Sequence, residues 1–492
     1  MNAPTHKLSV VEKVGYSLGD LAANLIFQTL VTFLAFFYTD VFRIAPGQAS
    51  LITFVSGMIG AFVFTPIMGL IADRTKTRWG KFRPWILWTA VPFGGLALLA
   101  FSTPALSPEG KIIYAWVTYL LLLAVYAANN LPYSALSGVL TSSMAERNSL
   151  SSYRFVAVMF AQFIIQVLLL PIVLMLGDGD KTVGFHNAMI LFASMGIVCF
   201  IITFLTTKER ILPIAKEKTS VAQDISDLFR NLPWLIMLIV TVLVFINLSL
   251  KGSAYIYYFK NYLDEAALIA FLNNIGFNTF IASLNSFVIS MGFSGFKWPE
   301  DPATSAFSLF SACSILMQIV GIFFSKAIAD KFGKRNTFGV ALFVSTLFLL
   351  IFNWFPKDAI ALCYIANICH GLAYGVTVPL LWAMVADVAD YSEWKNHRRA
   401  TAIIFSAMIA GLKAGLTIGG SLLLSILAFY GYDATLSVQT PETISGIKAS
   451  ISIYASIPFF LAVASLYFFS ISKKMETQIE TELDDRRKAA GQ

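Results

Sequence analysis

Several ionisable side chains, Lys251 among them, interrupt stretches of the sequence that are otherwise apolar, and three of them are candidates for chemistry. Asp20 lies in the first apolar stretch, His370 near the middle of the tenth, and Lys413 in the eleventh. A titratable group inside an apolar span is costly, so it faces a cavity or a partner. A carboxylate accepts hydrogen bonds from hydroxyl groups, and a histidine can carry a proton in the physiological pH range. These residues are candidates for ligand binding or proton transfer, and the alternative for His370 is a packing role.

Polar and aromatic side chains accompany Asp20 at helical spacing. Tyr16 and Asn24 lie four residues before and after it, and so share its face of a helix. A second stripe, at steps of three and four, consists of Tyr126, Asn129, Asn130 and Tyr133. Such groups suit a sugar, because hydroxyls need polar partners and the apolar ring face needs a flat surface. The alternative for Asp20 is a structural ion pair with Arg154 or Lys413.

The composition predicts the elements that must position these residues. The chain has 492 residues, of which 57% are hydrophobic and only 13% charged. Apolar runs of about 18 or more residues recur along it, which indicates a polytopic membrane protein. All spans should be helices, since lipid offers backbone groups no partner. The predicted spans are 14–40, 49–72, 84–104, 112–136, 153–176, 185–207, 233–262, 303–326, 336–356, 359–386, 400–430 and 449–472.

The basic residues predict how the chain is oriented. Lys and Arg gather in alternate loops, and this asymmetry places both termini and the basic loops in the cytoplasm. It also accounts for the net charge of +7 without nucleic acid. Two of these loops are alike, because Ala72-Asp73-Arg74 and Ala329-Asp330-Lys331 each follow the second apolar span of a half. The repeat predicts two related halves, each with a cytoplasmic hinge.

Four parts of the chain follow from these boundaries. Residues 1–207 form an N-terminal six-helix bundle, and 233–472 form a C-terminal one with an outer insertion at 263–302. The linker 208–232 has apolar residues at helical spacing, which predicts an interfacial helix. The tail 473–492 is a charged helix for which a solvated or interfacial role is expected.

Several stretches resemble a known family. Gly19-Asp20, the Arg-Trp-Gly-Lys-Phe-Arg-Pro run 78–84, Asn130-Leu131-Pro132-Tyr133 and the segment from Ala386-Asp387 to Glu393 are similar to those of the glycoside–pentoside–hexuronide:cation symporters, the melibiose permease group. The resemblance implies the major facilitator fold, an all-α membrane protein of twelve transmembrane helices in two six-helix bundles. It also implies a secondary active transporter that imports a sugar by alternating access.

The resemblance assigns roles to single residues. Asp20 matches the family's sugar-binding aspartate, Arg154 a basic residue near the sugar, and Lys413 the lysine beside the cation site. The alternative for Arg154 is a cytoplasmic gate with Asp387 or Asp390. Asn130 stands where melibiose permease has a second aspartate, so galactosides are not the expected substrate. The predicted substrate-binding residues are Asp20, Tyr16, Asn24, Tyr126, Asn130, Tyr133, Arg154 and Lys413.

The second span departs from sodium-coupled relatives. Those relatives have two aspartates four residues apart, where this chain has Ala61 and Thr65. Without carboxylates to offset its dehydration, sodium loses its ligands there. We therefore expect proton coupling or plain facilitated diffusion rather than sodium symport. The candidate coupling residues are Asp20, Lys413 and His370, with an Asp20–Lys413 pair in the empty carrier. A sodium symporter with a relocated cation site remains an alternative.

Charged residues at the cytoplasmic ends of the helices are expected to form gates and loops. They are Asp73, Arg74, Arg78, Lys81, Arg147, Asp330, Arg335, Asp387, Asp390 and Arg398. The sequence has no motif of a membrane-embedded enzyme, and we expect no metal site and no cofactor. The expected partners are a sugar, a coupling cation (H⁺ rather than Na⁺) and the lipid of the inner membrane, with the protein monomeric and no nucleic acid bound. A lipid or amphiphile carrier of the same fold is the other alternative.

Overall fold

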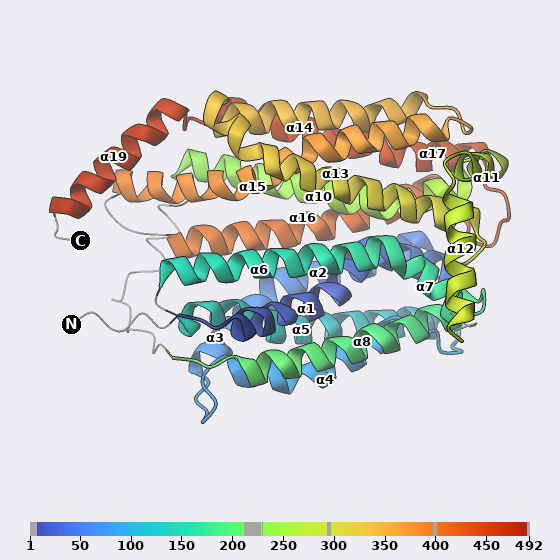
Figure 1. Ribbon diagram of the computed structural model, residues 1–492, viewed down its shortest axis with the longest axis horizontal. Coiled ribbons are helices and arrows are strands. Elements are labelled where there is room, and N and C mark those ends of the chain that lie inside the picture. The colour runs from blue at the N-terminus through green and yellow to red at the C-terminus, as the bar shows by residue number, and fades with distance from the viewer. Residues whose placement is uncertain are drawn as a thin grey trace. The chain divides into compact units, whose positions relative to one another are not determined.

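The computed structural model describes residues 7–141, 143–210, 228, 230–292, 297–396 and 401–489. Within these ranges the chain forms helices joined by short loops, and the only β-type pairing is an isolated bridge between Thr77 and Gly80. Figure 1 labels these helices along the chain. Among the described residues, eleven helical segments have the length and apolar composition to cross a membrane.

The first half of the chain contains eight α-helices, some continued by short π-helical (η) segments. They are α1 (Val10–Phe36) with η1 (Phe37–Val41), α2 (Pro46–Ile59) with η2 (Gly60–Phe64), α3 (Thr65–Arg74), α4 (Arg83–Ala100), α5 (Pro108–Leu140), α6 (Met144–Phe163) with η3 (Ile164–Leu168), α7 (Leu169–Leu176) and α8 (Lys181–Thr206).

The second half begins with α10. Its helices are α10 (Leu232–Asn261), α11 (Glu265–Asn274), α12 (Phe277–Ser290), α13 (Pro302–Phe332), α14 (Lys334–Leu350) with the 3₁₀ segment η4 (Ile351–Trp354), α15 (Ile360–Asn396), α16 (Thr401–Phe429), α17 (Pro441–Ile451), α18 (Ile453–Ser465) with η5 (Leu466–Phe468), and α19 (Lys473–Ala489).

Each predicted span corresponds to a helix or to two joined helices. The third span is α4, which is not among the eleven because Arg83 and two tryptophans in its first turns lower its mean hydropathy. The insertion at 263–302 is more regular than predicted. It contains α11 and α12, which are bent by 76° and together have the length and composition of a broken span or re-entrant loop.

The described chain divides into two compact units. One contains residues 1–215, 268–309 and 424–439, and the other contains 216–267, 310–423 and 440–492. These boundaries differ from the predicted ones in grouping 268–309 and 424–439 with the N-terminal half. Within the first unit, Tyr432 donates a hydrogen bond to Asp40 (2.8 Å), and the hydroxyls of Ser50 and Ser425 lie 2.8 Å apart.

Helix α1 is the central element of the first unit. It packs against α6 and α8, and small residues allow the close approach, as is common between helices in membranes. A Cβ atom on Gly15 would lie 2.0 Å from the Thr206 hydroxyl, and one on Gly19 would lie 2.5 Å from the Tyr133 ring. Asp20, one residue further on, is thereby held inside the unit.

Helices α13 and α15 touch backbone to backbone in the second unit. A Cβ atom on Gly321 would lie 2.2 Å from the Leu372 carbonyl oxygen, and one on Gly375 would lie 2.1 Å from the Gln318 carbonyl oxygen. Gly371 faces the Ser314 backbone in the same way. His370 precedes Gly371 on α15 and contacts Lys251 of α10 and Ser345 of α14.

Candidate functional site

A largely buried ion pair of the first unit joins α1 and α6. Arg154 Nε donates to Asp20 Oδ2 at 2.5 Å, and the two side chains are 28% and 6% exposed. The sequence offered a sugar role and a structural pair with Arg154 as alternatives for Asp20. The structure forms the pair, and both groups still have hydrogen-bonding capacity for a ligand, since a guanidinium has five N–H donors and a carboxylate two oxygens.

Two buried tyrosine rings pack against the arginine of this pair. The rings of Tyr16 and Tyr133 stack with centroids 4.6 Å apart, and the Arg154 guanidinium carbon lies 5.6 and 5.4 Å from them. Each hydroxyl donates to the backbone carbonyl of the other residue, at 2.8 and 2.7 Å. In this conformation their hydroxyls are occupied, so the two residues contribute cation–π surface rather than hydrogen bonds.

The other predicted site residues of this unit differ in whether their polar groups are available to bind a ligand. Asn24 donates to the Asp20 carbonyl oxygen at 2.9 Å. Tyr126 stacks on Phe27 at 5.5 Å. Asn130 is half-buried and makes no hydrogen bond to any described residue. Asn130 therefore offers an amide to a ligand, whereas Asn24 stabilises α1 locally.

The second span has no pair of carboxylates to hold a cation. Ala61 is buried, and the Thr65 hydroxyl donates to the Gly60 carbonyl oxygen across the π-helical segment η2 at 2.9 Å. No group of three or more His, Cys, Asp or Glu among the described residues can hold a metal ion.

His370 has a partner that the sequence analysis missed. Its Nε2 atom is hydrogen-bonded to Lys251 Nζ of α10, and its Nδ1 atom contacts Ser345 of α14. Both Lys251 and His370 are buried. The general cost of an ionisable group in an apolar span could have marked Lys251 as it marked His370. Lys413 lies in the same unit, and the predicted Asp20–Lys413 pair, which joins residues of different units, stays a prediction.

The basic loop between α3 and α4 is held by a second missed residue, Glu209. Its carboxylate accepts hydrogen bonds from the backbone N–H groups of Lys81 (2.8 Å), Phe82 (2.7 Å) and Arg83 (2.9 Å). A carboxylate is favourable there because these N–H groups form the N-terminus of α4. Among the predicted loop residues, Lys81 pairs with Asp73 at 2.7 Å, whereas Arg74 is exposed. The exposed Arg78 lies over the Trp79 ring.

Three of the remaining predicted gate residues form hydrogen bonds that end on backbone carbonyls. Arg147 donates to the carbonyls of Thr141 and Gly138 and so caps the end of α5. The Asp330 carbonyl accepts from Lys473, and Arg335 donates to the Tyr467 carbonyl. Arg398 lies outside the described residues.

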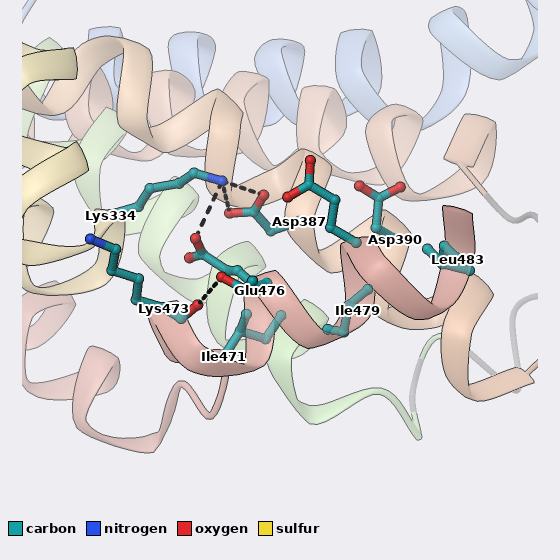
Figure 2. Close-up of a pocket in the computed structure, with 10 residues that line it drawn as sticks. Lys334, Asp387, Asp390, Ile471, Lys473, Glu476, Ile479 and Leu483 are labelled. Atoms are coloured by element: carbon teal, nitrogen blue, oxygen red, sulfur yellow. Dashed lines mark hydrogen bonds and ion pairs between the residues drawn. The ribbon is translucent and has the colours of Figure 1, made fainter. Parts of the chain in front are cut away.

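Asp387 and Asp390 belong to a polar pocket between α15 and α19. Lys334 donates to both carboxylate oxygens of Asp387, at 2.5 and 2.7 Å, and lies 3.7 Å from Glu476 (Figure 2). Asp390 lines the same pocket, whose volume is about 370 Å³. The tail helix therefore packs against α14 and α15 of the second unit and is not simply a solvated segment. It buries Ile479 and Leu483 against the bundle.

A second contact fixes the far end of α19. Trp394 Nε1 donates to Glu482 at 2.6 Å, and Arg486 donates to the Trp394 carbonyl oxygen at 3.0 Å. Hydrogen bonds from Gln478 and Trp394 lower the pKa of Glu482. By contrast, burial and the nearby Asp387 raise the pKa of Glu476.

The Glu482 contact at the far end of α19 is expected to weaken in acid. Because the pKa of Glu482 is lowered in the docked state, its contribution is present above the ordinary pKa of glutamate and is lost as the pH falls through the lowered value. The raised pKa of Glu476 acts in the opposite direction at the other end of the helix, so the test concerns the amides near Glu482. Their hydrogen exchange, corrected for intrinsic rates, should show faster opening at low pH. Glu482→Gln should show fast opening already at neutral pH. Glu480→Gln is the matched control, because Glu480 makes no hydrogen bond to a described residue; equal effects of both variants would contradict the prediction.

Comparison with known proteins identifies the family. The family model described as "MFS/sugar transport protein" matches residues 15–291 and 301–473. The putative glycoside/cation symporter YagG of Escherichia coli (strain K12) is 33% identical over 489 residues, covering 99% of this chain and 97% of that protein. The inner membrane symporter YicJ of the same organism is 32% identical over 487 residues (99% and 97%). The isoprimeverose transporter of Lactiplantibacillus pentosus is 29% identical over 480 residues (96% and 91%).

Solved structures confirm the fold expectation. A bacterial homologue of the human lysosomal transporter Spinster, in an inward-facing and unoccupied conformation, has a TM-score of 0.62 at 12% identity, covering 96% of this chain and 99% of that one. A likeness at this identity shows the fold alone. Together with the family match, it shows a multi-pass membrane transporter and not an enzyme. The chain belongs to the MFS/sugar transport protein family, within the glycoside–pentoside–hexuronide:cation symporters of the major facilitator superfamily.

Proposed function

We propose that this protein imports a glycoside or short oligosaccharide across the inner membrane by alternating access, in symport with protons. The observation that supports this most is the buried Asp20–Arg154 pair above the stacked Tyr16 and Tyr133 rings. A carboxylate acceptor beside a guanidinium donor matches the hydroxyls of a sugar, and the fully buried Tyr16 and Tyr133 rings hold Arg154 in position. The names of the relatives, a glycoside/cation symporter and an isoprimeverose transporter, support the substrate class.

Three residues are proposed to contact the sugar directly. Asp20 accepts from sugar hydroxyls, Arg154 donates to them, and Asn130 supplies an amide with no partner among the described residues. Tyr126, which stacks on Phe27, is proposed to face the apolar side of the sugar ring. Tyr16 and Tyr133 hold Arg154 in place. In an alternating-access cycle, the substrate binds near the midplane and the two bundles expose it to each side in turn.

The choice of coupling ion rests on the second span. Ala61 and the hydrogen-bonded Thr65 provide no negative charge for sodium, which needs oxygen ligands that offset its dehydration. A proton needs only a basic group that changes partner during the cycle. Asp20, Lys413 and His370 are the residues proposed for this role.

An uptake assay tests both parts of the proposal. Proteoliposomes containing the full chain should accumulate radiolabelled isoprimeverose, or another glycoside of a panel that includes a glucuronide, when an inward proton gradient is imposed. Replacing sodium by choline at fixed pH should leave uptake unchanged, and a protonophore should abolish accumulation. Sodium-stimulated uptake without a proton effect would refute proton coupling, and the absence of uptake for the whole panel would refute the substrate class.

A further inference from the structure

The second unit contains a buried lysine that has no carboxylate partner among the described residues. Lys251 of α10 is 7% exposed and His370 of α15 is 1% exposed. Lys251 Nζ is hydrogen-bonded to His370 Nε2 and lies 5.3 Å from the centroid of the Tyr374 ring. No salt bridge to Lys251 is formed by a described residue. An ammonium in an apolar interior without an anion is costly, so the site has a strong tendency to give up its charge.

The hydrogen bonds of His370 define its tautomer. Nδ1 lies 3.0 Å from the Ser345 carbonyl oxygen, which can only accept, so Nδ1 carries the hydrogen. The Ser345 hydroxyl lies 2.8 Å from the same nitrogen. Nε2 is then left with a lone pair directed at Lys251. The imidazole is a neutral acceptor, and one extra proton suffices to convert the pair from Lys–NH₂ and neutral His to Lys–NH₃⁺ and neutral His.

The side chains around the pair can stabilise one positive charge on Lys251, and none of those named below carries a negative charge at neutral pH. Tyr374 stacks on the His370 ring at 6.0 Å and on Phe459 of α18 at 5.9 Å, so its ring faces both members of the pair. Titratable groups on elements packed around the pair include Tyr374 and Cys369 on α15, Tyr255 one turn along α10 and Tyr454 on α18. They also include Lys413 on α16, which packs against α10 at Gly411, Gly415 and Gly419. None of them is an acid that is ionised at neutral pH.

We propose that the Lys251–His370 pair is the binding site of the coupling proton in the C-terminal bundle. This inference rests on the proposed sugar–proton symport and assigns its proton to a site separate from the Asp20–Arg154 pair. The proton adds to Lys251 Nζ from water, and the ammonium is stabilised by the Nε2 lone pair and by the face of Tyr374. Its release leaves two neutral groups. Because the pair joins α10 to α15, the strength of this link depends on whether the proton is bound.

The first experiment detects the proton without any sugar. Nitrogen-15 histidine spectra of the full-length protein in nanodiscs should show His370, assigned with His370→Gln, as the Nδ1–H tautomer. Its Nε2 signal should shift between about pH 5 and about pH 9 as the bound proton is lost, and this shift should be absent in Lys251→Met. A histidine with hydrogen on Nε2, or a signal independent of pH in the native protein, would overturn the assignment.

The second experiment separates this inference from the proposed function. With isoprimeverose as the probe, Lys251→Met and His370→Gln should lose accumulation driven by a proton gradient but keep equilibrium exchange of sugar, which needs no net proton movement. Lys260→Met, on the exposed part of the same helix, should behave like the native protein. Unimpaired accumulation in Lys251→Met would sink the inference while leaving symport intact. Absence of transport in the native protein would instead refute the proposed function, and the spectra would still decide on the proton site.

Discussion

Asp20→Asn is expected to abolish sugar binding and to destabilise the first unit. The substitution leaves the Arg154 guanidinium without its anion, although three quarters of that side chain is buried. Removing one partner of a buried ion pair costs about 3–5 kcal/mol, and the partial exposure of Arg154 places the expected loss near the low end, at about 3 kcal/mol. The measurements are the free energy of unfolding in detergent and the dissociation constant for the transported glycoside.

A double variant distinguishes a functional pair from a structural one. Asp20→Asn combined with Arg154→Gln removes both charges, so much of the lost stability should return. If the pair binds the sugar, binding should remain absent in the double variant. If binding returns together with stability, the pair is structural and the substrate site lies elsewhere. Asp73→Asn is the matched control, because Asp73 is 68% exposed in its pair with Lys81 and should contribute less than about 1 kcal/mol.

Glu209→Ala is expected to release the basic loop between α3 and α4. The change removes the acceptor of three neighbouring backbone N–H groups at a helix N-terminus. Each fully buried N–H group left without an acceptor lowers the free energy of unfolding by about 1–3 kcal/mol. Because these three N–H groups are only half-buried, the expected loss for all three together is about 2–4 kcal/mol. Thermal unfolding should report the loss. A cysteine introduced at position 78 should react faster with an impermeant maleimide in inside-out vesicles.

Two further variants test the cause of that effect. Lys208→Ala changes the exposed neighbour of Glu209 and should leave both measurements unchanged. Gly80→Ala should resemble Glu209→Ala, because Gly80 has φ +116° and a Cβ atom there would lie 2.4 Å from the Glu209 carboxyl carbon. If Glu209→Ala retained the native unfolding temperature and labelling rate, the loop would be held by other contacts.

The helices were predictable because hydropathy and the need to pair backbone groups act locally along the chain. The same reasoning could mark Asp20 as an intramembrane acid but could not choose its partner. That choice depends on α6 lying against α1, and Arg154 is 134 residues away in sequence. Tyr16 and Tyr133 were predicted as site residues from their spacing, yet where their hydroxyls point depends on the close packing at Gly19.

The residues that the sequence analysis missed are defined by contacts over long sequence separations. Glu209 follows the last helix of the first half and reaches a loop 126 to 128 residues earlier. Nothing in its local sequence indicates that role. A solvated or interfacial role was predicted for the charged tail helix. In the structure its apolar side packs on α15, Glu476 lies near Lys334, and Glu482 accepts a hydrogen bond from Trp394. Charge on one side of a helix does not exclude docking of the other.

The glycine contacts between α13 and α15 have a mechanical consequence. Two backbones in direct contact have no compressible side-chain layer between them, and packed interiors of this kind transmit strain rather than absorb it. The helix pair is therefore stiff along its shared length, and any bending of the second unit during a transport cycle must occur at joints made of side chains. The contact between α10 and α15 includes the side-chain hydrogen bond between Lys251 and His370. We therefore expect a displacement of α13 to move α15 with it and to change this side-chain contact.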